Sequence, residues 1–197
     1  LIDFKSYKKD KNNDKELVTK LWDIFDEEDI IIGHNSDRFD IRKANARFVA
    51  HGLKPPTPYR SVDTKKIAKK NFMFNSNGLN DLCKHFKLGE KTNTGGFELW
   101  LGCIAGNKKS WNKMVKYNKQ DVELLEKLYL KLRGWEGNHP SLSIINETED
   151  SCPTCNSTNI QSRGLGVNKV SKFRRWQCQD CGRWSRGKPI RTNIDIR

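Results

Sequence analysis

Two aspartates fall on the apolar faces of helices that the sequence predicts, where a charged side chain is unusual. One is Asp121, within a long helical pattern over residues 110–133. Residues three or four positions apart form one stripe along this pattern: Met114, Tyr117, Asp121, Leu125, Leu128 and Leu132. A carboxylate on an inward face is costly unless a cation compensates for it. Asp121 is therefore a candidate ligand for a hard divalent cation.

The second aspartate, Asp40, ends the stretch "DIIIGHNSDRFD". Its three isoleucines predict a buried strand, and the polar corner after them leads into a helix expected over residues 37–52. Asp40 shares one face of this helix with Ala44 and Phe48. A capping role or a lysine partner would also explain an aspartate near a helix start, but not Asp121. Because open α/β folds bind ligands at the carboxyl ends of their strands, we expect the corner to deliver Asp40 to such a site.

Four of the six cysteines form two Cys-x-x-Cys pairs separated by 22 residues: Cys152 with Cys155, and Cys178 with Cys181. Four thiolates in a tetrahedron suit Zn²⁺, and two such pairs are typical of a zinc ribbon. A redox pair is the alternative, which the doubling of the motif disfavours. A domain of this size with so little apolar content needs a metal to fold. Cys83 and Cys103 lie among apolar residues and are expected to be core thiols.

Basic and aromatic residues surround the second cysteine pair. Residues 151–197 hold ten Lys and Arg against two Asp and Glu, so they carry +8 of the chain's net charge of +13. Basic groups neutralise phosphates and flat aromatic rings stack on unpaired bases, so we expect nucleic-acid contacts here. The candidates are Lys172, Phe173, Arg174, Arg175, Trp176, Arg183, Trp184, Arg186 and Lys188. The alternative is that the aromatic rings form the small core of the ribbon and the arginines solvate it.

The elements that must position these residues follow from hydrophobic periodicity. Helices are predicted over residues 13–25, 37–52, 64–72, 78–89 and 110–133, and strands over residues 29–35 and 59–64. Asn13 and Glu16 fit a capping box, and Asp63 is expected to cap the helix after it. Alternating strands and helices predict an α/β fold whose sheet is at least partly parallel. The expected domains are residues 1–133 and a zinc ribbon over 151–197, joined by a Gly-, Pro- and Ser-containing linker over 134–150.

The segments "GHNSDRFD" and "YNKQD" resemble the second motif (Asn-x-x-x-Phe-Asp) and the third motif (Tyr-x-x-x-Asp) of the DnaQ-like 3′–5′ exonucleases. The segments "SVDT" and "GGFELW" also resemble the predicted-exonuclease branch of that family. The resemblance covers roughly residues 1–133. It implies a ribonuclease H-like mixed sheet with flanking helices, and a site for two Mg²⁺ or Mn²⁺ ions held by four carboxylates.

Within this resemblance, Asp40 and Asp121 would be metal ligands, and Tyr117 would orient the attacking water. Tyr117 is otherwise an ordinary half-buried helix tyrosine. Asn35 either fixes the corner between strand and helix or contacts the nucleotide. Phe39 either packs beneath the terminal base or belongs to the core.

The first motif of the family, Asp-x-Glu on its first strand, is missing from this sequence. The one candidate is Asp3, but Lys5 stands where the glutamate is needed, and an ammonium group cannot coordinate a metal. We interpret residues 1–5 as the third strand of the family's sheet and expect the first two strands to be absent. The chain begins at Leu1, so we expect it to be cut from a longer protein whose upstream part carries the motif. A degenerate binding domain is the alternative.

Three functions are therefore open: a metal-dependent 3′–5′ exonuclease whose ribbon grips DNA or RNA, a non-catalytic nucleic-acid-binding protein, and a zinc-ribbon adaptor to a polymerase. We expect the nucleic acid to be DNA rather than RNA. No run of about 18 apolar residues exists, which excludes a membrane-spanning protein. No signal peptide is visible, and we expect a cytoplasmic protein, associated with the nucleoid or, if viral, located in the host cytoplasm.

Overall fold

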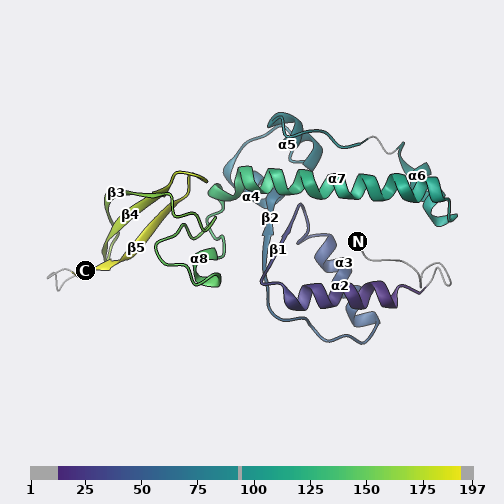
Figure 1. Ribbon diagram of the computed structural model, residues 1–197, viewed down its shortest axis with the longest axis horizontal. Coiled ribbons are helices and arrows are strands. Elements are labelled where there is room, and N and C mark those ends of the chain that lie inside the picture. Colours follow the sequence, from purple (N-terminus) through teal and green to yellow (C-terminus); the bar gives the residue numbers. More distant parts are fainter. Residues whose placement is uncertain (1–12, 93–94, 192–197) are drawn as a thin grey trace. The chain divides into compact units, whose positions relative to one another are not determined.

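The computed structural model describes residues 13–92 and 95–191 (Figure 1). The chain divides into two compact units, Leu1–Tyr129 and Leu130–Arg197. Asp3, Lys5 and the strand expected over residues 1–5 lie outside the described residues.

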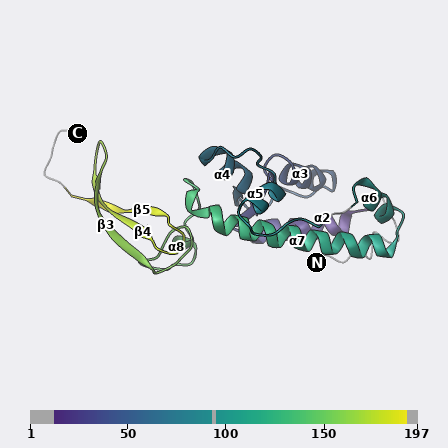
Figure 2. The same cartoon turned by 90° about the horizontal axis from the view of Figure 1, so that it is seen from above.

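Unit 1 is an α/β unit, as the sequence predicts. Its elements are α2 (Lys15–Glu27), β1 (Ile30–Gly33), α3 (Asp40–Ala50), β2 (Arg60–Asp63), α4 (Thr64–Asn71), α5 (Leu79–His85), α6 (Phe97–Ile104) and most of α7 (Lys108–Leu132). The two strands pair in parallel, with Gly33 opposite Asp63 at their carboxyl ends. Figures 1 and 2 show α5 lying beside α7, where the buried Cys83 Sγ is 3.7 Å from the Leu124 carbonyl oxygen. This confirms Cys83 as a core thiol.

Helices α2 and α3 bury their apolar stripes against each other and against β1. The cluster consists of Val18, Phe25, Ala44 and Phe48, with Ile31 and Tyr59 packed on it. The ring of Phe25 meets those of Phe48 and Tyr59 edge to face, with centroids 5.6 and 5.4 Å apart. Both partners of Asp40 on the predicted stripe, Ala44 and Phe48, are therefore core residues, which fixes the start of α3 against the end of β1.

The corner between β1 and α3 depends on backbone geometry that few residues allow. A Cβ at Gly33 would lie 2.2 Å from the Ser36 Oγ, so the close approach of the buried Ser36 requires glycine. Asn35 is left-handed, with φ 65°, and its N–H donates to the Asp63 Oδ1 over 2.8 Å. The same carboxylate accepts from the N–H groups of Lys65 and Lys66 at 2.9 and 3.4 Å. Asp63 thus caps α4, as predicted, and also anchors the corner.

Three local predictions differ from the structure. The capping box is wrong: Asp14 is the N-cap of α2, while the Asn13 Oδ1 accepts from the Lys15 N–H. Helix α3 begins at Asp40 and ends at Ala50, inside the expected range. It starts later than expected because the residues between β1 and α3 form the corner. Helix α6 was not predicted, since its eight residues give too short a period to recognise.

Unit 2 holds a three-stranded antiparallel sheet in the order β3 (Ile160–Val167), β4 (Lys172–Cys178) and β5 (Trp184–Ile190). Residues 134–150, expected to be a linker, carry part of the 3-10 helix Arg133–Trp135 and the short helix α8 (Leu142–Ile145). They also bond to the ribbon: the Leu142 N–H donates to the Pro153 carbonyl over 2.7 Å. This segment therefore packs against the cysteine loops of unit 2.

None of the helices in the described ranges combines the length and apolar content that crossing a membrane demands.

Replacing Asp63 tests the corner. We expect Asp63→Ala to lower the free energy of unfolding by about 1–3 kcal/mol, because three backbone N–H groups lose their acceptor. Asp63→Asn keeps an acceptor oxygen and should recover much of the loss. Urea unfolding followed by circular dichroism measures both. Asp23→Ala, at an exposed position on α2, is the control and should change stability by less than about 0.5 kcal/mol. Equal losses of unfolding free energy in the variants at positions 63 and 23 would contradict the anchoring role of Asp63.

Candidate functional sites

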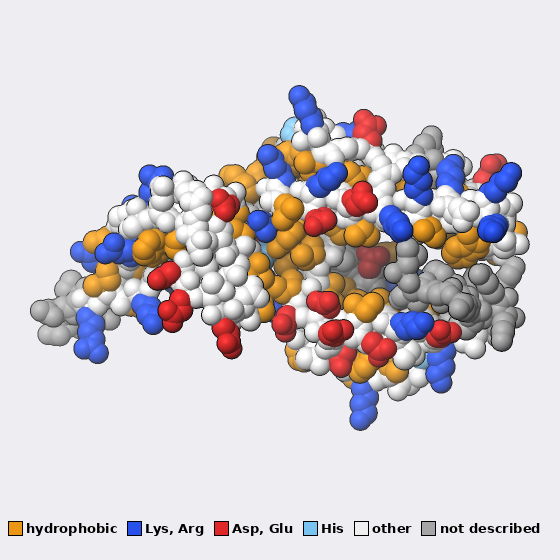
Figure 3. All heavy atoms as spheres, in the orientation of Figure 1, with side chains coloured by type: hydrophobic (Ala, Val, Ile, Leu, Met, Phe, Trp, Pro, Cys, Tyr) orange, Lys and Arg blue, Asp and Glu red, His pale blue; other side chains and the backbone are white. Residues whose placement is uncertain are grey.

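Asp40 and Asp121 line the same pocket of unit 1, which has a volume of about 430 Å³. Its apolar wall includes Phe25, Ile31, Ile32, Leu79, Val122 and Leu125. Figure 3 shows this face of unit 1 hollowed between α7 and α2, with acidic and hydrophobic side chains in the hollow. Asp40 is exposed at the first turn of α3, whereas Asp121 is half-buried on α7. Two carboxylates from separate helices thus line one pocket next to the end of β1.

The sequence analysis rejects a lysine partner for Asp121, and this is wrong, because Lys91 compensates its charge. Lys91 Nζ lies 2.7 Å from the Asp121 Oδ2 and donates to the Tyr117 hydroxyl over 3.2 Å. Partial burial lowers the pKa of Lys91, but the bonds to Asp121 and Tyr117 outweigh this effect and raise the pKa above its ordinary value. Lys91 therefore carries its charge at neutral pH. The signal available in sequence was weak, because Lys91 and Asp121 are 30 residues apart.

The residue set nevertheless fits a hard cation at Asp121. The Asp121 Oδ1 is buried, and no described residue gives it a hydrogen bond. A buried carboxylate oxygen without a donor is costly, and a divalent cation is the partner such an oxygen suits. In the described ranges, neither Asp40 nor Asp121 belongs to a group of three or more His, Cys, Asp or Glu side chains close enough to hold one metal ion. The pocket thus offers two carboxylates of the four that the resemblance implies.

His34 also lines the pocket and was missed by the sequence analysis. Its Nε2 lies 3.0 Å from the Asn77 carbonyl, which can only accept, and its Nδ1 lies 2.9 Å from the Thr64 Oγ1. Burial lowers the pKa of His34, and Nε2 of the neutral ring donates to the Asn77 carbonyl, while the Thr64 hydroxyl donates to the Gly33 carbonyl over 3.0 Å. Both nitrogens are engaged, and His34 ties the end of β1 to α4 and to the segment before α5.

The residues that line this pocket do not include the other predicted residues of unit 1, which are Tyr117, Phe39 and Asn35. Tyr117 is half-buried and packs on the cluster of Leu99, Cys103 and Met114, which confirms Cys103 as a core thiol. Phe39 is 57% exposed, so its alternative role as a core residue is wrong. Asn35 forms the corner through its backbone, as described above.

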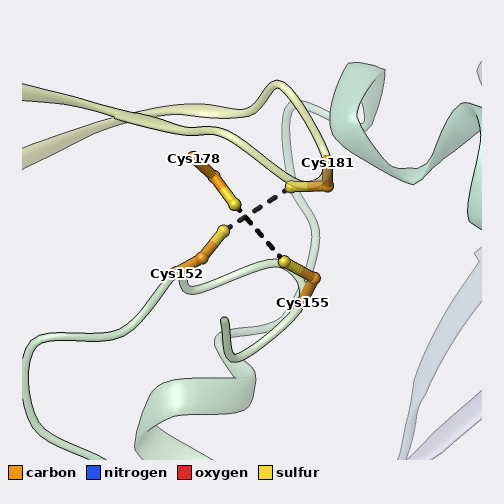
Figure 4. A group of neighbouring side chains, drawn as sticks. All are labelled: Cys152, Cys155, Cys178 and Cys181. Carbon is orange, nitrogen blue, oxygen red and sulfur yellow. Dashed lines mark hydrogen bonds between the residues drawn. The ribbon is translucent and has the colours of Figure 1, made fainter. Parts of the chain in front are cut away.

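The four cysteines of unit 2 converge on one point (Figure 4). Their sulfur atoms all lie within 4.8 Å of one another, and the pairs Cys152–Cys181 and Cys155–Cys178 are each 3.6 Å apart. Four sulfurs about 2.3 Å from a central Zn²⁺ would be roughly 3.8 Å apart, so the cluster has the size of a tetrahedral Cys₄ site. With all four positions filled by protein, such a site is structural.

The basic residues of the ribbon do not share one face. Arg183 is engaged with the backbone: its guanidinium donates to the carbonyls of Gly134 and Gly137 over 3.5 and 3.1 Å. Arg174 donates to the Ser162 hydroxyl over 3.4 Å. The remaining predicted contacts on β4 and β5 are Lys172, Phe173, Arg175, Trp176, Trp184, Arg186 and Lys188.

Unit 1 is thus an α/β unit with acidic side chains near the carboxyl ends of its parallel strands, and unit 2 is a ribbon with four clustered cysteines. The family model of the RNase H superfamily matches residues 2–133, which is 132 of the 197 residues. The chain therefore belongs to the RNase H superfamily. Comparisons with curated proteins and with solved structures give no match.

Removing the charge of Lys91 tests its effect on this pocket. We expect Lys91→Met to bind Mn²⁺ about fivefold more tightly, because an ammonium group 2.7 Å from the Asp121 Oδ2 repels a cation at the other oxygen. Electron paramagnetic resonance of free Mn²⁺ measures the binding. The control Lys84→Met removes an equal charge from a surface pair with Glu90. Equal Mn²⁺ affinity in both variants would show that the charge of Lys91 does not weaken metal binding at Asp121.

Proposed function

We propose that this protein is a two-metal-dependent 3′–5′ exonuclease of the DnaQ-like type, which hydrolyses the terminal phosphodiester bond of DNA or RNA. One observation supports this most: Asp40 and Asp121 reach one pocket from different helices, and the Asp121 Oδ1 is buried without a donor among the described residues. Membership of the RNase H superfamily supports the wider nuclease class.

In this proposal, Asp40 and Asp121 hold Mg²⁺ or Mn²⁺ at the end of β1. Such ions activate a water molecule and stabilise the leaving 3′ oxygen when they are bound. Tyr117 lies one turn before Asp121 on α7, and its hydroxyl orients the water once Lys91 no longer donates to it. The exposed ring of Phe39 lies directly before the first residue of α3, and Asn35 lies in the corner before it. A terminal nucleotide would lie beside them.

We further propose that Cys152, Cys155, Cys178 and Cys181 hold one Zn²⁺ that stabilises unit 2. The ribbon keeps little apolar surface buried, and Cys152 and Cys178 are among its few fully buried side chains. Because so small a core supplies little stability, the metal would hold the loops together. The basic strands of the ribbon then bind the substrate.

A non-catalytic nucleic-acid-binding protein is the second candidate, and one observation favours it. The described part of unit 1 supplies two carboxylates, and Lys91 already neutralises one of them. Two divalent ions close together need more negative charge to offset their repulsion. An adaptor role towards a polymerase stays a third candidate that rests on the ribbon alone.

Cleavage of a 5′-labelled oligonucleotide with Mn²⁺ distinguishes these functions. We expect slow shortening from the 3′ end, since only two of the expected carboxylates are in the pocket. Asp121→Asn should abolish the shortening and preserve substrate binding, because it removes a ligand and no phosphate contact. Tyr117→Phe should be milder, with a loss of about ten- to a hundredfold.

Two outcomes would count against the exonuclease. Shortening that survives Asp121→Asn would place the chemistry elsewhere, and internal cleavage products would exclude attack at the 3′ end. Binding without any Mn²⁺-dependent cleavage would favour the non-catalytic candidate. Lys84→Met, which leaves the pocket untouched, is the control for surface charge.

For the ribbon, we expect elemental analysis to find one zinc per chain. A strong chelator should unfold β3, β4 and β5 while the helices of unit 1 stay folded, because the metal stabilises unit 2 alone. Cys155→Ser should lower the zinc content, whereas Cys103→Ala, in the core of unit 1, should leave it at one per chain. A zinc-free preparation with an intact ribbon sheet would refute the assignment.

A further inference from the structure

One face of the ribbon sheet carries an arginine–aromatic quartet of Phe173, Arg175, Trp184 and Arg186. Side chains alternate between the two faces of a strand, so Phe173 and Arg175 of β4 share a face, as do Trp184 and Arg186 of β5. In the register of these strands, Arg175 lies directly opposite Arg186. All four residues line one groove of about 490 Å³ in unit 2, which is within the size range of ligand sites.

The guanidinium groups of the quartet lie against its rings. Arg175 Cζ is 5.9 Å from the centre of the Trp184 ring, and Arg186 Cζ is 5.7 Å from the centre of the Phe173 ring. Gly166 on β3 leaves room for this arrangement, because a Cβ there would lie 2.7 Å from the Phe173 Cε2. Cation–π contact holds each arginine in place and keeps its donors free to point outward.

The charge of the quartet has no acidic counterpart at the groove. None of the described residues that line it is Asp or Glu. Like charges directly opposite each other on neighbouring strands destabilise the pair. A phosphate between Arg175 and Arg186 would remove this repulsion, since guanidinium groups bind phosphate oxygens with paired donors. The groove is therefore complementary to an anion.

The aromatic rings of the quartet favour single-stranded over duplex nucleic acid. Trp184 is 49% exposed beside the paired arginines, so its ring has a face open to a base. Bases of a duplex are stacked on each other and cannot reach such a ring, whereas unpaired bases stack on aromatic side chains without regard to sequence. Arg183 lines the groove as well, but its bonds to Gly134 and Gly137 assign it to the framework.

We propose that this face of the ribbon is the single-strand binding site of the protein, with a base stacked on Trp184 and a phosphate held between Arg175 and Arg186. The opposite face, with Lys172, Arg174 and Trp176, does not bind the strand. The proposal rests on the proposed function for its substrate class, and it narrows that class to single-stranded ends.

Two double variants of the full chain test the face. Arg175→Ala with Arg186→Ala removes two charges from the quartet, and Lys172→Ala with Arg174→Ala removes two charges from the other face of β4. The probe is a labelled oligothymidylate of about 12 nucleotides, within the usual range of single-strand site sizes. All variants carry Asp121→Asn, and binding is measured by anisotropy at several salt concentrations.

We expect the quartet variant to lose at least tenfold in affinity, and the magnitude of its salt slope to fall by about 0.7, the value for one lost phosphate contact on a single strand. The other double variant should lose less than threefold. Trp184→Ala should lose about tenfold with an unchanged slope, and Trp184→Phe should recover part of it, because stacking carries no charge. Zinc content and circular dichroism verify that each variant is folded.

Equal losses of affinity in the two double variants would overturn the proposal. They would show that the ribbon attracts the strand through its overall charge and not through one face. Equal affinity for a duplex of the same length would overturn the single-strand assignment, and unchanged binding in the quartet variant would exclude the ribbon as the grip. None of these results depends on cleavage, so they are independent of whether Asp40 and Asp121 form a working nuclease site.

Discussion

The charge of Asp121 is the constraint on which the candidate active site depends. A carboxylate on the inward face of α7 must have a cationic partner, and Lys91 reaches it from the segment between α5 and α6. That segment is held in place by further bonds: the Lys91 N–H donates to the Asn80 Oδ1 over 2.9 Å, and Gln120 Nε2 donates to the Glu90 carbonyl over 2.6 Å. The position of one carboxylate thereby links α5, α7 and the chain between them.

The sequence predicted what local spacing determines and missed what depends on contacts between distant residues. The period of α7, the strand before Asp40, the cap by Asp63 and the spacing of the cysteines each lie within one continuous stretch of sequence. The predicted burial of that strand is wrong: Ile30 and Ile31 are half-buried and Ile32 is exposed. Lys91 and His34 acquire their roles from partners 26 or more residues away, Tyr117, Asp121 and Asn77 among them. A lysine in a polar segment and a histidine after a strand have no periodic signature, so a single sequence cannot identify them.

The ribbon shows the same limit for charge. Counting Lys and Arg locates the basic region but does not say which side chains act together. The strand geometry divides Arg174 from Arg175 although they are adjacent in sequence, because successive side chains of β4 point to opposite faces. The backbone carbonyls of Gly134 and Gly137 take up the donors of Arg183. The three predicted contacts Arg174, Arg175 and Arg183 therefore have three different environments.

The two candidate metal sites are chemically separate, and this separation has a consequence for how the protein works. Carboxylate oxygens select hard ions such as Mg²⁺ and Mn²⁺, whereas four thiolates select Zn²⁺. The exposed Asp40 lets ions exchange with solvent at the pocket, while Cys152 and Cys178 are almost completely buried. A buried, fully coordinated ion exchanges slowly, so in the proposed function unit 2 would keep its structure while metal ions bind to and leave the pocket of unit 1. The proposed binding of substrate by the ribbon would then persist when the pocket is empty, as an exonuclease needs if it is to hold a strand between successive cleavages.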